Sequence, residues 1–281
     1  MKNIILWLGA GQIGLAIARR VGFEHKILIG DKSLEKAEAM AKILGEAGFD
    51  AETAYADLKD KTSILDFIAL GLKKGQIKHL ISSGGVSPSQ ASIETILQVD
   101  LWGTAVLLDE VGKVIMPGGS GVHISSQSGF RMPQLGEKID RDLATLSPDE
   151  LLSLDILNPK NIRDSLHAYQ LAKRCNEKRV MAEAVKWGQR GARINDIAPG
   201  IIVTPLALDE FNGVRGEFYK NMFIKCPAGR PGTADEIAEL AEFLLSSRSS
   251  FVSGSTFLMD GGATASYFYG PLQPNVKPNI K

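Results

Sequence analysis

Short apolar runs alternate with longer segments of helical period along most of the chain, and this alternation limits the fold more than any other feature. Runs such as residues 3–8 and 26–30 are apolar at nearly every position, and a helical segment follows each of them. Short runs of this kind are typical of strands buried on both faces. Such strands between amphipathic helices predict βαβ units, and therefore an α/β fold whose parallel sheet is covered by helices on both faces.

The expected elements follow one another along the printed sequence. Strands are expected at residues 3–8, 26–30, 51–57, 78–84, 121–126, 192–200 and 255–262. Helices are expected at residues 14–21, 33–48, 60–72, 92–116, 161–188 and 233–247. The second of these helices has Ser33 as its N-cap and Gly48 as its terminator. No repeat, low-complexity tract or linker divides the chain, so one domain over residues 1–281 is expected.

Two segments interrupt the alternation, at residues 131–160 and 205–229. In the first, Ser147, Pro148 and Glu150 form the pattern of a capping box with proline at the first helical position, which predicts a short helix. The second has few periodic signals and contains several glycines and prolines.

Composition and charge exclude several classes of partner. The 32 basic residues equal the 32 acidic ones, so no net field attracts nucleic acid or an anionic membrane. No stretch approaches the ~20 apolar residues of a membrane span. Cys175 and Cys226 lack disulfide or metal spacing, and His25, His79 and His167 are too scattered for a metal site. The sequence therefore predicts a cytoplasmic protein without a metal.

The segment GAGQIG follows the first expected strand and precedes a helix. The spacing of Gly9, Gly11 and Gly14 allows a tight turn, close approach of the backbone to a pyrophosphate, and close packing of helix on sheet. The helix N-terminus around Gln12 and Ile13 offers free N–H groups and the positive end of the helix dipole. Glycine-rich turns also occur without a ligand, so the loop alone leaves both interpretations open.

Asp31 ends the second expected strand, 22 positions after Gly9. A carboxylate in this place accepts hydrogen bonds from ribose hydroxyls and repels a 2′-phosphate, which favours NAD over NADP. Two alternatives stay open. Lys32 can hold that phosphate instead, and Asp31 can be a plain turn residue before Ser33.

Tyr169 and Lys173 lie four positions apart in an expected helix. Residues at this spacing share one helix face, as many ordinary surface pairs do. A cation this close also favours the ionised form of a phenol and lowers its pKa from about 10. The spacing alone does not decide between a surface pair and a catalytic pair.

With these residues in place, the sequence resembles the short-chain dehydrogenase/reductase family over nearly its whole length. The resemblance implies a single Rossmann-type, doubly wound domain with a seven-stranded parallel sheet. The matching motifs occur in the family's order: the N-terminal glycine loop, ADL at 56–58, SSGG at 82–85, ISS at 124–126, Tyr169-x-x-x-Lys173, RINDIAPGIIVTP at 193–205 and MDGG at 259–262.

The resemblance implies catalytic roles for Ser126, Tyr169 and Lys173. Ser126 would bind the substrate's carbonyl or hydroxyl oxygen, and Tyr169 would exchange a proton with it. Lys173 would acidify the phenol and hold the nicotinamide ribose. Further cofactor positions are implied at Asp57, Leu58, Ser83, Gly84, Gly85, Pro199, Gly200, Ile202 and Thr204. His123, beside the serine strand, is expected to be a packed strand residue.

The sequence also departs from the family pattern. Trp7 and Leu8 stand where a threonine and a first glycine are usual, so the phosphate cradle is expected to differ in detail. The SSGG segment lacks the amide side chain that braces the sheet in the family. Asp100 occupies the place of the family's asparagine, the fourth catalytic member. An ionised aspartate accepts but does not donate hydrogen bonds, so Asp100 either pairs with Lys173 or packs at a helix bend.

The resemblance also indicates where the two irregular segments lie relative to the site. Residues 131–160 lengthen the connection between Ser126 and Tyr169. We predict that they form a structured flap, at the substrate cleft or in a subunit interface, that buries Leu151, Leu152 and Leu154. Residues 205–229 lie where the family has a substrate lid. Their apolar side chains indicate an apolar substrate or a lid packed on the core: Leu206, Leu208, Phe211, Phe218, Met222 and Phe223.

Together these observations predict an NAD-dependent oxidoreductase that interconverts a secondary alcohol and a ketone, on a fairly apolar substrate such as a hydroxysteroid-like compound. A homodimer or homotetramer is expected from the resemblance, with Tyr267, Phe268 and Tyr269 docked on a neighbouring subunit or on the body. The alternative is a dinucleotide-binding regulatory protein that kept the fold and lost turnover.

Overall fold

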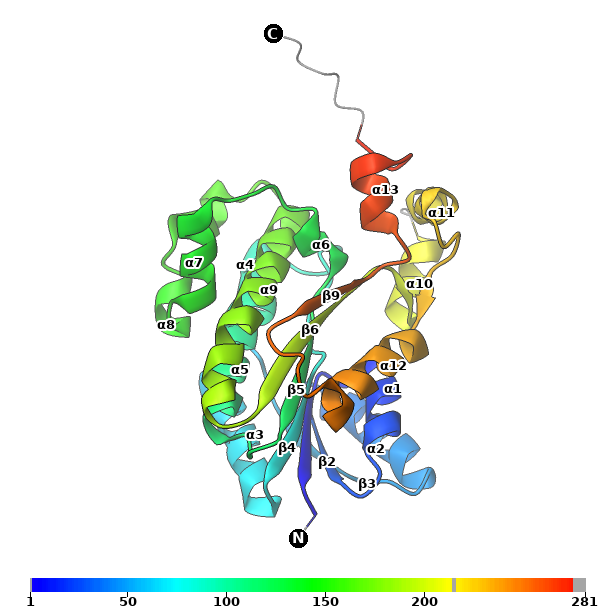
Figure 1. Cartoon of the computed structure of the whole chain (residues 1–281). Coiled ribbons are helices and arrows are strands. Elements are labelled where there is room, and N and C mark those ends of the chain that lie inside the picture. The colour runs from blue at the N-terminus through cyan, green and yellow to red at the C-terminus, as the bar shows by residue number, and fades with distance from the viewer. Residues whose placement is uncertain (1, 214–215, 275–281) are drawn as a thin grey trace.

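Seven parallel strands form the central sheet of the protein. The structure is a computed structural model that describes residues 2–213 and 216–274 (Figure 1). The strand order is β3-β2-β1-β4-β5-β6-β9, with every neighbouring pair parallel. The sheet strands are β1 (Ile4–Leu8), β2 (Lys26–Asp31), β3 (Asp50–Tyr55), β4 (Ile77–Ser82), β5 (Ser120–Ile124), β6 (Arg193–Pro199) and β9 (Thr256–Met259). The α/β, doubly wound prediction is confirmed.

Helices cover both faces of this sheet (Figure 1). One face carries α3 (Lys61–Lys74), α5 (Thr104–Val114) and α9 (Ser165–Gln189). The other carries α1 (Gln12–Val21), α2 (Leu34–Glu46) and α12 (Ala234–Leu245). Successive strand side chains point to opposite faces, so Leu6 packs in the first core and Ile5 and Trp7 pack in the second.

Local capping signals set several helix boundaries. Ser33 accepts a hydrogen bond from the Lys36 N–H at the start of α2, and Gly48 follows that helix with a φ of +89°. Both predictions are confirmed. The long helix expected from residue 161 begins at Ser165 instead, because the Asp164 side chain caps it by accepting from the His167 N–H. The expected start was therefore wrong by about one turn.

The 131–160 insertion folds into short helices outside α9 (Figure 1). The predicted capping box is confirmed at α8 (Pro148–Leu151). Leu151 is fully buried and Leu154 half-buried, but Leu152 is 36% exposed, so the prediction for Leu152 was wrong. The remaining helices of the segment are α7 (Glu137–Thr145), η2 (Asp155–Leu157) and η3 (Pro159–Asn161).

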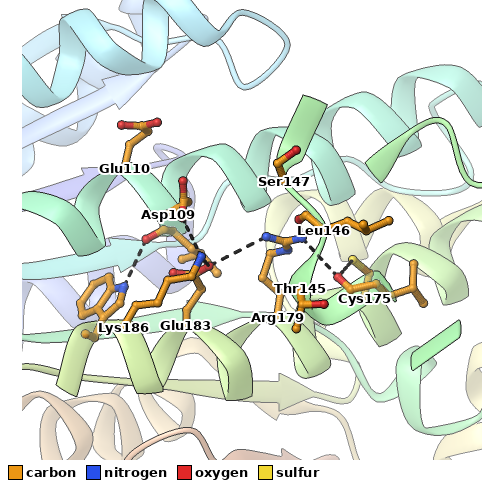
Figure 2. A network of polar contacts seen from close by, with 12 residues as sticks. Asp109, Glu110, Thr145, Leu146, Ser147, Cys175, Arg179, Glu183 and Lys186 are labelled. Carbon is orange, nitrogen blue, oxygen red and sulfur yellow. Dashed lines mark hydrogen bonds and ion pairs between the residues drawn. The ribbon is translucent and has the colours of Figure 1, made fainter. Parts of the chain in front are cut away.

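Buried polar contacts fix this insertion to α9 (Figure 2). The Arg179 guanidinium donates to the Leu143 and Leu146 carbonyl oxygens at the C-terminal end of α7. Arg174 forms an ion pair of 2.6 Å with Asp140. Leu143, Leu151 and Leu157 lie in one apolar cluster with residues of α9 and of the helical segment 96–105. The insertion is a packed layer of the fold.

The 205–229 segment also contains helices that the sequence did not predict. They are α10 (Pro205–Asn212) and α11 (Gly216–Lys225), next to a two-stranded sheet of β7 (Ile202–Val203) and β8 (Gly232–Thr233). The side chain of Leu206 lies outside the described part of the structure. The remaining elements are α4 (Ile93–Ile96), the π-helical turn η1 (Leu97–Gly103), α6 (Gln127–Phe130), η4 (Ser247–Ser249) and α13 (Ala263–Tyr269). Every described helix is too short or too polar to cross a membrane.

Candidate active site

The predicted site residues gather at the carboxyl edge of the sheet. The glycine loop follows β1, Asp31 ends β2, Ser83 follows β4, and Ser126 follows β5. Because the strands are parallel, their carboxyl ends meet at one edge, where open α/β sheets bind their ligands. Segments far apart in the sequence are thus brought to one place.

The glycine loop lies tightly against the chain that follows β4. Gly9 has a φ of +97°, and a Cβ on it would lie 2.2 Å from the Gly84 backbone nitrogen. At Gly11, by contrast, an added Cβ meets no atom within 4 Å, so the loop is open on that side. The helix α1 then begins at Gln12 without a side-chain cap and without an acid in its first turn. These features fit a pyrophosphate held at the helix N-terminus.

Trp7 accounts for the departure of this loop from the family pattern. Its buried indole N–H lies 2.7 Å from the Gly9 carbonyl oxygen and 3.0 Å from Ser83 Oγ, and the Ser83 hydroxyl donates to the same carbonyl at 2.9 Å. A Cβ on Gly14 would lie 2.1 Å from the indole nitrogen. The indole therefore fills the space beneath the loop, and Ser83 braces β4 against β1.

Asp31 braces the other side of the loop. One carboxylate oxygen accepts from the Ala10 N–H at 2.8 Å and the other from the Ser33 N–H at 2.9 Å. Each oxygen keeps a further lone pair, so the carboxylate retains the capacity to accept from ribose hydroxyls. Lys32, the competing residue for a 2′-phosphate, is exposed. Asp31 is therefore a turn residue in its contacts, and its carboxylate can accept further hydrogen bonds.

The other predicted cofactor positions lie around this loop and the end of β6. Leu58 is buried against Gly84, and the Asp57 carboxylate accepts from the Lys59 N–H in its own turn. Gly200 follows β6, where a Cβ would lie 2.7 Å from the Asp260 Cα. Pro199 ends β6, Ile202 lies in β7, and the Thr204 hydroxyl caps α10 by accepting from the Ala207 N–H.

Tyr169 and Lys173 share one face of α9. The Lys173 Nζ lies 5.1 Å from the centre of the Tyr169 ring, and Lys173 is only 3% exposed. Burial lowers the pKa of Lys173, but the charges of Asp100, Tyr169 and Asp196 together raise it above its ordinary value. The lysine therefore remains an ammonium ion next to a half-buried phenol.

Asp100 lies in the π-helical turn η1 and is fully buried. Its Oδ1 accepts from the Val86 N–H at 2.9 Å, and a Cβ on Gly85 would lie 2.8 Å from this oxygen. Burial raises the pKa of Asp100, while Lys173 and the Val86 N–H lower it. Asp100 therefore packs at an irregular helical turn, and its charge interacts with that of Lys173. π-Helical turns are frequent at functional sites.

Ser126 follows β5 and begins the short helix α6. Its Oγ accepts from the Ser128 N–H at 3.2 Å, and its side chain is half-buried. The preceding Ser125 turns the other way, and its hydroxyl donates to Asp196 Oδ2 at 2.6 Å. The two serines therefore have different surroundings, and the second is the one with solvent access.

Comparison with known proteins identifies the chain. Residues 3–137 match the family model described as short chain dehydrogenase, and residues 150–264 match that described as enoyl-(acyl carrier protein) reductase. A short-chain dehydrogenase/reductase of Alternaria brassicicola, bsc3, is 37% identical over 94% of this chain and 96% of its own length. The chain belongs to the short-chain dehydrogenase/reductase family. A 7alpha-hydroxysteroid dehydrogenase of Bacteroides fragilis is 28% identical over 94% of both chains.

Solved structures agree with the fold of this dehydrogenase/reductase. The crystal structure of levodione reductase superimposes with a TM-score of 0.76 at 24% identity, covering 94% of this chain and 98% of the other. A short-chain dehydrogenase/reductase from Serratia marcescens gives a TM-score of 0.71 at 21% identity, over 93% and 98% of the two chains. The protein is an oxidoreductase of this family, whose named relatives act on CH–OH groups.

Several residues at the site escaped the sequence analysis. Asp196, in the middle of buried strand β6, faces Ser125, and Glu177 lies on α9 one turn after Lys173. Arg131 donates to Gln127, and its guanidinium lies 5.1 Å from the ring centre of Tyr267, which joins α6 to the C-terminal helix α13. A charged residue inside an apolar strand was the signal for Asp196, since such a residue is rarely buried without a function.

Two hollows differ in their relation to this site. A cavity of about 220 Å³ borders Gly200 and Ile202 and is lined from the 205–229 segment by Met222, Phe223 and Cys226. A larger one, of about 620 Å³, lies at the amino ends of the strands beside His79. Only the first lies at the carboxyl edge, so it belongs with the candidate active site.

Proposed function

We propose that this short-chain dehydrogenase/reductase uses NAD to interconvert a secondary alcohol and a ketone, with Tyr169 as the general acid/base. The observation that carries the proposal is the Lys173 ammonium, buried and 5.1 Å from the Tyr169 ring, on the helix that lies beside the serine strand. A nearby cation stabilises a phenolate, and this lowers the pKa of a tyrosine toward the range useful for catalysis.

In this mechanism Ser126 orients the substrate by a hydrogen bond to its oxygen. Tyr169 donates its phenolic proton to that oxygen during ketone reduction and removes the alcohol proton in the opposite direction. Lys173 stabilises the phenolate formed in the first case or required in the second. NAD, when bound, supplies the hydride donor or acceptor. Asp100 accepts a hydrogen bond from the Val86 N–H through Oδ1. Its other oxygen, Oδ2, is available as an acceptor for Lys173.

The residues of the glycine loop favour NAD over NADP. The Asp31 carboxylate lies at the end of β2 and would repel a 2′-phosphate, while the side chain of Lys32 is exposed. We expect NADH to bind more tightly than NADPH in titration calorimetry. Lys32→Ala serves as the control: if the lysine binds the 2′-phosphate, this variant should lose affinity for NADPH and keep its affinity for NADH. Equal affinities in the unsubstituted protein would show that Lys32 outweighs Asp31.

The lid favours a fairly apolar substrate. Met222 and Phe223 line the cavity next to Ile202, and the named relatives include an enzyme of hydroxysteroids. Arg131 at the end of α6 provides a polar group next to Tyr267 of α13. A substrate with an apolar body and one polar end fits this distribution of side chains.

A dinucleotide-binding protein without turnover is the second candidate, and Asp100 in place of the family's asparagine is the observation that favours it. A panel of secondary alcohols and ketones, tested with both cofactors by the absorbance of reduced nicotinamide, distinguishes the two. We expect turnover with NAD, and its loss in Tyr169→Phe with cofactor affinity retained. Cofactor binding without turnover on the whole panel supports the regulatory candidate. Substantial kcat in Tyr169→Phe would assign the proton transfer to another group.

A further inference from the structure

A row of buried polar side chains crosses four neighbouring strands behind Lys173. Ser82, His123, Asp196 and Thr256 are paired in register across β4, β5, β6 and β9. Residues in register on parallel strands point to the same face of the sheet. Ser82 is 2% exposed, and His123 and Asp196 are fully buried. The layer of this face closest to the site is therefore polar, although the layers below it form the apolar core.

The residues of α9 that face this row are polar as well. Lys173 interacts electrostatically with Asp196 and with His123, and Glu177 interacts with Asp196. Several buried atoms here make no hydrogen bond to any described residue: Asp100 Oδ2, His123 Nε2, Asn176 Oδ1 and Nδ2, Glu177 Oε1 and Asp196 Oδ1. A buried polar group without a hydrogen bond is unfavourable, so the concentration of such groups behind Lys173 directs attention to this layer.

Asp196 connects this polar layer to the catalytic serine. Its Oδ2 accepts the Ser125 hydroxyl at 2.6 Å, and the Ser125 N–H donates to the Ile197 carbonyl at 2.8 Å. Both the side chain and the backbone of Ser125 are thus fixed to β6. Because Ser126 is the next residue, the direction in which Ser126 leaves β5 depends on these two hydrogen bonds.

Asp196 also interacts electrostatically with the Lys173 ammonium, as Asp100 does. The charged and titratable groups around it are Lys173 and Glu177 on α9 and His123 on β5, and Thr256 on β9 carries no charge. Burial raises the pKa of Asp196 to about 7 and the pKa of Glu177 to about 8. Burial lowers the pKa of His123 well below its ordinary value, so this histidine stays neutral.

We propose that Asp196 is a positioning residue of the dehydrogenase reaction: it fixes Ser125 beside Ser126 and partly offsets the positive charge of Lys173, and so sets the pH range in which Tyr169 exchanges its proton. The inference rests on the proposed function of Tyr169. The aspartate is one of two buried carboxyl groups whose charges act on this one ammonium, and the Ser125 and Thr256 side chains favour its ionised form.

The sign of the effect follows from the charges. When Asp196 is neutral, the ammonium of Lys173 acts on Tyr169 without opposition and stabilises the phenolate. When Asp196 is ionised, it cancels part of that field, and the pKa of Tyr169 rises. Asp196→Asn keeps an oxygen for the Ser125 hydroxyl but removes the charge. We therefore expect the pKa of Tyr169 to fall by about one unit in this variant.

The primary test measures that pKa directly, in the full-length protein saturated with NAD. The ring carbons of the tyrosines are labelled with ¹³C, the Tyr169 signal is assigned by its loss in Tyr169→Phe, and the signal is titrated with pH. Glu183→Gln is the matched control, because Glu183 is also a fully buried acid on α9 but pairs with Lys186 away from the site. Ser125→Ala removes the hydrogen bond and keeps the charge.

We expect a lower Tyr169 pKa in Asp196→Asn and an unchanged one in Glu183→Gln and Ser125→Ala. The pH profile of kcat for alcohol oxidation should move in parallel in Asp196→Asn, whereas Ser125→Ala should lower kcat several-fold at all pH values. An unshifted Tyr169 pKa in a folded Asp196→Asn overturns the proposal. If no alcohol is oxidised but the Tyr169 pKa still shifts, the proposed reaction fails while the electrostatic role of Asp196 stands. Should Asp196→Asn not fold, Asp196→Glu, which keeps the charge, must retain the unsubstituted pKa for the proposal to stand.

Discussion

The 131–160 insertion and the 205–229 segment, the proposed lid, both interrupt the regular alternation, yet they are built in opposite ways. The insertion buries Leu143 and Leu151 completely, and Arg179 binds its backbone from α9. The lid leaves Phe218 61% exposed and Ile224 81% exposed, and much of its packing is within itself. An irregular sequence pattern therefore does not tell whether a segment is buried or exposed. The two segments differ in their contacts with the rest of the fold: the insertion is packed against α9, and the proposed lid leaves large apolar side chains exposed.

The largest effect is expected at Arg179, whose side chain is 1% exposed. Arg179→Met leaves the Leu143 and Leu146 carbonyl oxygens without this donor and removes the cation near buried Glu183. We expect a loss of about 3–5 kcal/mol in the free energy of unfolding, measured by urea denaturation. Lys220→Met in the exposed lid is the control and should change stability little. A loss below about 1 kcal/mol would mean that the insertion is not anchored through Arg179.

A second substitution compares the apolar contacts of the two segments. Leu143→Ala should lower the free energy of unfolding by about 3 kcal/mol, because the side chain is fully buried in the cluster against α9. Leu208→Ala, at a lid position that is 47% exposed, should change it by less than about 0.5 kcal/mol. Similar losses in the two variants would contradict the contrast between a packed insertion and an open lid.

The smallest effect on stability is expected at Phe218, where a substitution should instead change substrate binding. Phe218→Ala removes an exposed aromatic side chain of α11, so the free energy of unfolding should stay within about 0.5 kcal/mol. If the lid covers the substrate, KM for the alcohol found in the panel should rise several-fold while cofactor affinity stays constant. Leu152→Ala, at the exposed position of the insertion, is the matched control and should leave KM unchanged. An unchanged KM in Phe218→Ala would separate this side chain from substrate binding.

Features governed by neighbouring residues were predictable from the sequence. The strands follow from continuous apolar runs, and the caps at Ser33 and Ser147 follow from contacts within four residues. Pairs far apart in the chain were not. Asp196 meets Ser125 across 71 positions, and Arg179 reaches a carbonyl 33 positions away. The π-helical turn at Asp100 and the exposure of Leu152 likewise depend on what packs against them.

The same limit applies to the candidate site. Spacing and resemblance placed the glycine loop, Ser126, Tyr169 and Lys173 at one edge of the sheet, and the parallel topology brings them there. The SSGG segment lacks the amide side chain that braces the sheet in the family. The Ser83 hydroxyl braces it instead by donating to the Gly9 carbonyl oxygen, a long-range contact that the separate motifs do not reveal.

The position of Trp7 also gives this enzyme an internal optical reporter. Its indole lies directly beneath the glycine loop, hydrogen-bonded to the carbonyl of the turn that would hold the pyrophosphate. The emission of an indole responds to charge and hydrogen bonding at its nitrogen, and reduced nicotinamide absorbs in the range in which indoles emit. The chain has three tryptophans, and Trp187, a residue of α9, is buried on the opposite face of the sheet. Tryptophan fluorescence can therefore follow cofactor binding without any attached dye. The part of the fluorescence change that is lost in Trp7→Phe reports on the indole beneath the loop.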